Sequence, residues 1–208
     1  MKKFIVLLLT TCMLLCILLT GCGKKSEIEG FWHAEIDLTD FINESLGNEE
    51  LGEYVKISYF CFDYFAYFND DGTYEFKFDT EGAATMYEQV REDFKKGVLE
   101  YFQAMIDENN ADITVEELLE KQGKSLDELI EDEFPDEYLQ SFMDSLSHEG
   151  NYESKEGKLY LSASLDTRPS KEVYEEYTLE GDTLTITAGN TKQSGEFDVF
   201  PLVFEKLG

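Results

Sequence analysis

The segment that most constrains the fold is an aromatic stretch, YVKISYFCFDYFAYFNDDGTYEFKFD, which runs from Tyr54 to Asp79. Two apolar runs flank Asn69-Asp70-Asp71-Gly72, which predicts a long β-hairpin whose turn ends with Gly72 in the left-handed conformation. Asn69 then lies opposite Thr73. This register brings alternate apolar residues of the two strands together on one face, Phe68, Ala66 and Tyr64 against Tyr74, Phe76 and Phe78. We predict that this face belongs to the protein core.

The first strand of the hairpin is also apolar on its opposite face, through Ile57, Tyr59, Cys61, Phe65 and Tyr67. A strand that is apolar on both faces is normally covered on both. The sequence that follows offers a cover, because apolar residues recur in it at helical spacings of three and four, among them Tyr87, Val90, Phe94, Val98 and Phe102. We expect this helix to pack on the outer face of the strand; a lid over one end of the fold is the alternative.

Two residues of this outer face could carry chemistry, Asp63 and Cys61. A buried carboxylate needs a partner, and we expect Asp63 to pair with Arg91, Lys95 or Lys96 of the helix. Neither histidine is close to Cys61 in sequence, so we interpret Cys61 as a small apolar residue of a strand rather than a nucleophile.

The N-terminal residues indicate export. Lys2 and Lys3 precede an apolar run from Phe4 to Leu19 that is shorter than the about 20 residues of a membrane span. The tetrapeptide Leu19-Thr20-Gly21-Cys22 resembles the bacterial lipobox; a plain signal peptide or an uncleaved anchor is the alternative. The resemblance implies that residues 1–21 are a removed signal, that Cys22 is diacylated, and that residues 22–29 tether the protein to the outer face of the cell membrane.

The chain is strongly acidic, with 45 Asp and Glu against 17 Lys and Arg and a formal net charge of −28. Loss of Lys2 and Lys3 with the signal makes the mature protein more negative still. This charge excludes nucleic acid as a partner and repels anionic lipid headgroups, so membrane attachment depends on the acyl chains of Cys22. Among the four cysteines, Cys61 alone is left as a free thiol after processing, so the fold has no internal disulfide.

Strand-like and helix-like segments are separated along the chain. Residues 80–148 have helical periodicity, with 19 acidic against five basic residues, and Thr114 and Ser125 each begin a capping-box pattern. We predict three or four helices there. Around them we expect eight strands, at 30–38, within 54–79, and at 151–154, 158–165, 173–179, 183–188 and 200–207. The predicted fold is therefore α+β: an eight-stranded antiparallel meander β-barrel, residues 30–79 and 149–208, with an inserted all-helical segment, residues 80–148. An open sheet with helices on one face is the rival.

These segments resemble the lipocalins. Gly30-Phe31-Trp32 is similar to the Gly-x-Trp motif of the first lipocalin strand, and hairpin segments follow in the same order, at 68–74, 150–159 and 177–184. The resemblance implies that a basic residue of the last strand, here Lys206, stacks on Trp32 at the base of the barrel. It also implies ligand binding inside the barrel.

Two functions are compatible with this sequence. The first is a lipid-anchored, non-enzymatic protein that binds a small apolar or semi-polar ligand inside the barrel, with a packed core as the structural alternative. Its candidate lining is Trp32, Phe60, Phe62, Tyr64, Phe68, Tyr74, Phe76 and Phe78. The second is a cell-envelope interaction protein with a filled barrel, which uses the acidic helices to dock a basic protein or another cationic partner. We expect no catalytic residues, metal or cofactor, because His33 and His148 have no paired ligand spacing and no nucleophile or phosphate-binding motif is present.

Overall fold

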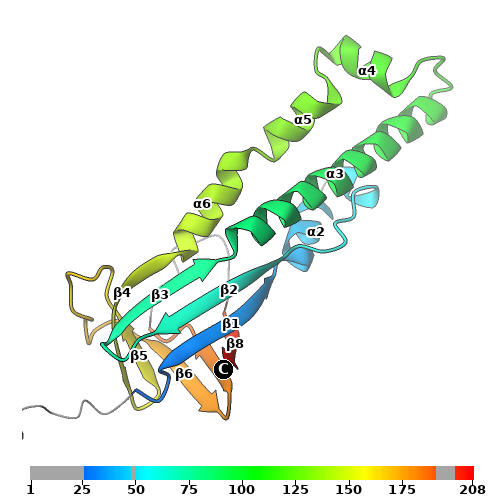
Figure 1. Ribbon diagram of the computed structural model, residues 1–208. Helices are drawn as coiled ribbons and strands as arrows, with labels where there is room; N and C mark the ends of the chain where they lie inside the picture. The colour runs from blue at the N-terminus through cyan, green and yellow to red at the C-terminus, as the bar shows by residue number, and fades with distance from the viewer. Residues whose placement is uncertain (1–25, 48–49, 191–199) are drawn as a thin grey trace, which may run out of the picture.

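The structure is a computed structural model that describes residues 26–47, 50–190 and 200–208. Cys22 and the signal segment lie outside the described residues. A barrel forms one end of the molecule, and helices extend from it in one direction (Figure 1). No helix in the described ranges combines the length and apolar character that a membrane span requires.

Eight strands of the described chain form a closed antiparallel barrel in sequence order. The first and last strands pair with each other, Trp32 opposite Lys206, and this pairing closes the sheet. The predicted α+β meander barrel is therefore confirmed, and the rival open sheet is wrong. The strands are β1 (Gly30–Asp37), β2 (Cys61–Phe68), β3 (Thr73–Phe78), β4 (His148–Lys155), β5 (Lys158–Leu161), β6 (Glu175–Glu180), β7 (Thr183–Thr187) and β8 (Leu202–Leu207).

The aromatic hairpin has the predicted register. Tyr64 lies opposite Phe78 and Phe68 opposite Tyr74. The Asn69 amide donates to the Thr73 carbonyl over 2.9 Å, and Gly72 has a φ of +86°, the left-handed conformation that glycine adopts at little cost. The turn chemistry therefore sets which side chains face the core.

Helices occupy the connections that follow β1 and β3. The first connection contains α2 (Thr39–Gly47) and the 3-10 helix η1 (Glu50–Glu53). Four helices lie between β3 and β4, as α3 (Thr80–Glu108), α4 (Val115–Gln122), α5 (Leu126–Glu133) and α6 (Asp136–Leu146). Both predicted capping boxes are present, at Thr114 and Ser125, so these short helices begin where the sequence indicates. We call α3–α6 the helical arm.

The described chain contains two apolar cores. One fills the barrel, and the other joins α3, α4 and α5 to residues 55–57, with Ile42 and Leu51 packed against it. The apolar stripe of α3 therefore packs against the connection between β1 and β2, beyond the end of the barrel (Figure 1). Gly97 permits the close approach, because a Cβ there would lie 2.6 Å from the Val55 Cα.

The expected helical cover over the outer face of β2 is correct for Ile57 and wrong for Phe65 and Tyr67. The strand itself begins at Cys61 rather than Tyr54, because residues 54–58 turn into the second core. Phe65 and Tyr67 remain half-buried beside Phe31, whose ring lies 4.3 Å from that of Tyr67. Strand neighbours thus supply part of the cover that we expected from the helix.

Candidate functional site

The rings that we predicted to line a cavity are packed against one another. No residue in the set Trp32, Phe62, Tyr64, Phe68, Tyr74, Phe76 and Phe78 is more than 5% exposed. Ring centroids lie 5.7 Å apart for Tyr64 and Phe76 and 5.7 Å apart for Phe68 and Phe76. Water-accessible space beside these rings would leave them exposed, so this part of the barrel is a close-packed core. Phe60 differs, because it is half-buried and packs against both cores.

The base of the barrel, the end that carries the 69–72 turn, contains the predicted Trp32–Lys206 pair. The Lys206 ammonium lies 4.9 Å from the Trp32 ring and donates to the Glu29 carbonyl over 3.1 Å. The buried Trp32 Nε1 donates to the Ile28 carbonyl over 2.8 Å. The Trp32 indole is therefore hydrogen-bonded to the segment that precedes β1, and Lys206 of the last strand covers its ring.

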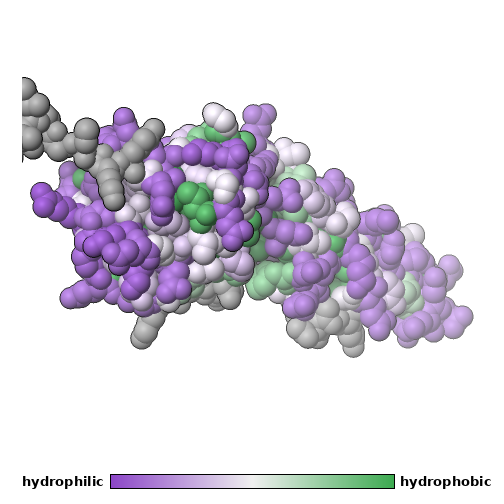
Figure 2. Space-filling model, turned by 90° about the horizontal axis from the view of Figure 1, so that it is seen from below, coloured by the Kyte–Doolittle hydropathy of each residue, from purple (hydrophilic) through white to green (hydrophobic). Residues whose placement is uncertain are grey.

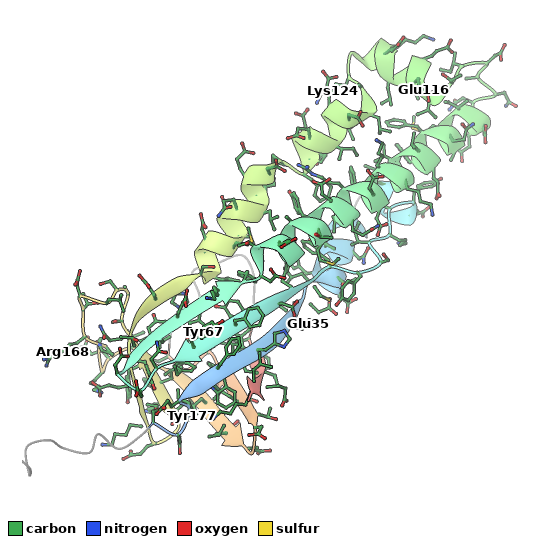
Figure 3. All side chains as sticks on the ribbon, viewed as in Figure 1. Glu35, Tyr67, Glu116, Lys124, Arg168 and Tyr177 are labelled. Atoms are coloured by element: carbon green, nitrogen blue, oxygen red, sulfur yellow. The ribbon has the colours of Figure 1, made fainter. Side chains whose placement is uncertain are left out.

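The first described residues are fixed to this base. Ser26 Oγ lies 2.7 Å from Ser154 Oγ, and the Tyr177 hydroxyl donates to Glu27 over 2.6 Å. Figure 3 shows Tyr177 at this end, opposite Glu116 and Lys124 near the far end of the helical arm. An open cavity of about 1070 Å³ at the base has a mostly polar and acidic lining, which includes Ser26, Glu27, Glu29, Asp70, Glu153 and Glu156.

The opposite end, which we call the mouth, is partly closed by α6. The Phe142 ring lies 5.4 Å from Phe62 and 5.5 Å from Phe78. The Tyr64 hydroxyl donates to the Leu146 carbonyl at the end of the helix, over 2.7 Å. The alternative of a helical lid over one end of the fold therefore applies to α6, whereas α3 packs on residues 55–57 in the second core.

Two inward-facing polar residues at the mouth were not among the predicted site residues. Glu175 pairs with the buried Leu159 across the sheet and is two residues from the buried Tyr177, so its side chain faces the interior. Burial raises the pKa of Glu175 to about 7. His148 lies opposite Phe76, with ring centroids 5.1 Å apart. Side chains alternate between the two faces of a strand, and this alternation along the predicted strand 173–179 could have identified Glu175 as inward-facing.

The outer face of β2 forms a second polar region. Asp63 is half exposed and accepts a hydrogen bond from His33 Nε2 over 2.5 Å. The expected partners Arg91, Lys95 and Lys96 are therefore wrong, because the helix that carries them points away from this face. Beside Asp63, an open cleft of about 390 Å³ separates the strand from the start of α3; Glu35, Tyr59, Cys61, Asp79 and Met86 contribute to its lining.

The exposed surface of the helical arm is mainly acidic. Basic residues there form pairs within the arm, such as Lys95 with Asp127 at 2.8 Å and Arg91 with Asp136 at 2.9 Å. The far part of the molecule is largely hydrophilic in Figure 2. Residues 80–148 contain 19 acidic residues and only five basic ones. Most carboxylates of the arm therefore remain without a cationic partner of their own.

The described residues include no group of three or more His, Cys, Asp or Glu side chains placed to hold a metal ion. No known protein family, curated protein or solved structure matches this chain. The geometry of the barrel, its mouth and the helical arm therefore provides the basis for a functional proposal.

Proposed function

We propose that this protein is a non-enzymatic, lipid-anchored component of the bacterial cell envelope that docks a basic protein through its acidic helical arm. In this proposal the lipocalin-like barrel is a filled scaffold. The observation that carries the proposal is the close packing of the barrel interior, where the inward-facing rings of β2 and β3 are at most 5% exposed. The helical arm is then the part of the molecule available for a large partner.

The placement of the chain ends supports this arrangement. The lipobox-like Cys22 precedes by four positions Ser26, which is fixed to the base of the barrel. The helical arm extends from the other end (Figure 1). Its longest helix has 29 residues, or about 44 Å at about 1.5 Å per residue. Acyl chains on Cys22 would therefore hold the base at the membrane and direct the arm outward.

The arm is also built to keep its shape. Val90, Phe94 and Val98 are at most 2% exposed and pack with Val55 and Ile57 in a core of their own. The Arg91 guanidinium donates from Nε to the Phe134 carbonyl over 2.9 Å, which joins α3 to the junction between α5 and α6. A rigid acidic surface loses little conformational freedom when it binds a cationic partner, and its charge accelerates the encounter.

The test uses full-length protein in non-ionic detergent micelles, with an octalysine peptide as the basic probe. One variant neutralises four exposed acids of the arm, Glu116, Glu120, Glu133 and Glu137, each to Gln. The matched control neutralises four exposed acids of the barrel, with Glu149, Glu156 and Glu180 changed to Gln and Asp182 to Asn. Both variants have the same net charge, so the comparison separates a local site from the overall field.

We expect salt-sensitive binding that weakens by about tenfold or more in the arm variant and by about twofold or less in the barrel variant. Equal weakening of the two variants would show that octalysine responds only to net charge. Absence of binding to the unmodified protein, or a larger loss in the barrel variant, would also refute the proposal.

A further inference from the structure

The connection between β5 and β6, residues 162–174, exposes apolar side chains to solvent. We call this connection the side loop. Leu165 and Val173 are each 50% exposed. Arg168 lies between them in the sequence, is exposed, and has no hydrogen-bond or ion-pair partner among the described residues. Two aliphatic side chains and an unpaired guanidinium within one short loop form an amphipathic surface, which suits a boundary between polar and apolar surroundings.

Hydrogen bonds hold both ends of the side loop. The Asn151 side chain in β4 donates to the Leu165 carbonyl over 2.8 Å and to the Thr167 carbonyl over 2.7 Å. At the other end, the Tyr174 backbone amide donates to Asn190 Oδ1 over 2.8 Å, and the Asn190 backbone amide donates to the Tyr174 carbonyl over 3.0 Å. The loop is therefore fixed on the barrel, and it loses little conformational freedom when its apolar side chains become buried.

The side loop also contacts the part of the barrel to which the N-terminal segment is fixed. Lys171 of the loop forms an ion pair with Glu153 of β4. The next residue of β4 is Ser154, whose Oγ lies 2.7 Å from Ser26 Oγ. Cys22 precedes Ser26 by four positions, which span at most about 14 Å in an extended chain. Acyl chains on Cys22 would therefore bring the bilayer surface close to the side loop.

Orientation and charge both favour a contact between this loop and lipid. Figure 3 shows Arg168 on the side of the barrel away from Glu116 and Lys124 of the helical arm. Residues 155–171 contain four basic and two acidic residues, whereas the whole chain has 17 basic and 45 acidic residues. This local excess of positive charge opposes the repulsion between the acidic protein and anionic headgroups.

From this arrangement we infer that the side loop is a membrane-contact site, which binds the phospholipid surface beside the lipid anchor. Leu165 and Val173 enter the boundary between headgroups and acyl chains, and the Arg168 guanidinium lies at the level of the lipid phosphates. The inference rests on the lipid anchor of the proposed function, because one short loop is too weak to hold this acidic protein at a bilayer. The second contact fixes the tilt of the barrel and directs the helical arm away from the membrane.

The experiment uses the processed, acylated protein in vesicles of phosphatidylcholine and phosphatidylglycerol in equal parts. A nitrobenzoxadiazole probe is attached at Ser170→Cys in the side loop or, as a control, at Ser141→Cys in α6; both serines are exposed. Cys61→Ala removes the buried free thiol from both proteins. Phosphatidylcholine with a nitroxide near the headgroup end of its acyl chain quenches a probe at the membrane surface. Flotation of the vesicles reports separately whether the protein is anchored.

Two further variants of the protein labelled at position 170 test which side chains make the contact. The loop variant changes Leu165 and Val173 to Gln. The matched control changes Leu207 and Val203 of β8 to Gln, and these residues are 37% and 49% exposed. Each variant removes one Leu and one Val from the exposed surface, so the comparison separates the side loop from exposed apolar residues in general.

We expect quenching at position 170 to exceed quenching at position 141 by about threefold or more. Quenching at position 170 should fall by about twofold or more in the loop variant and stay within about 1.2-fold in the β8 variant. Equal quenching at the two positions, or equal losses in the two variants, overturns the inference, while flotation of the protein shows that the anchor stands. Failure to float refutes the lipid anchor and this inference with it. Neither result bears on octalysine binding, so docking through the helical arm is tested independently.

Discussion

Replacement of Glu175 by Gln tests whether this side chain is buried inside the barrel, and the measured quantity is the pH dependence of the free energy of unfolding. Burial raises the pKa of Glu175 to about 7 from an ordinary value of 4.5. The native state therefore holds this proton more tightly than the unfolded state does. The associated stability is fully present below pH 4.5 and is lost as the pH rises through 7.

The size of the effect follows from the pKa difference. A shift of one pKa unit corresponds to about 1.4 kcal/mol, so the full change would be about 3 kcal/mol. The carboxylate retains some contact with water, and part of the loss has already occurred at pH 5. We therefore expect the free energy of unfolding of the native sequence to fall, relative to Glu175→Gln, by about 2 kcal/mol between pH 5 and pH 8.

Urea denaturation of the full-length protein at a series of pH values measures this difference. Glu176→Gln is the matched control, because Glu176 is exposed and lies on the outer face of the same strand. Its stability should follow that of the native sequence at every pH. If the Glu175→Gln curve instead runs parallel to the control from pH 5 to pH 8, Glu175 is not buried at the mouth and the reasoning about the barrel interior is wrong.

Three further predictions concern other parts of the molecule. Gly97→Ala should destabilise the arm by about 1–3 kcal/mol in denaturation, because its Cβ would meet the Val55 backbone, whereas Gly82→Ala should be tolerated because its Cβ meets only the flexible Asp79 side chain. Lys206→Ala should cost about 0.5–1 kcal/mol and increase acrylamide quenching of Trp32, the single tryptophan of the chain. Cys22→Ser should move the protein from the membrane fraction to the soluble fraction, as immunoblotting of the two fractions would show.

The lipocalin-like features of the sequence are local, and this explains how well they could be predicted. The Gly72 turn fixes the register of β2 and β3, and strict alternation then assigns Tyr64, Phe68 and Tyr74 to the interior. The Trp32–Lys206 contact followed from the resemblance together with the parity of the last strand. In each case a few neighbouring residues carry the information.

The errors arise where distant parts of the chain compete for the same apolar surface. The α3 stripe could have packed on Phe65 and Tyr67, but it packs on Val55 and Ile57, and Gly97 allows the backbones to approach there. We expected a helical partner for Asp63 because we expected α3 to cover the outer face of β2. Strand pairing instead places Glu35 opposite Asp63 and brings His33 of the adjacent strand within reach. Periodicity shows that a face is apolar, but it does not identify the surface that covers it.

The sequence by itself determined the hairpin register, the helix caps, the strand order and the acidic character of the arm, because turn chemistry, capping and alternation act over a few residues. Only the tertiary structure decided that β1 closes on β8, that a second core carries the arm beyond the barrel, and that Glu175 and His148 both face the barrel interior. These outcomes depend on which distant surfaces pack most closely, and close packing is a property of the whole folded chain.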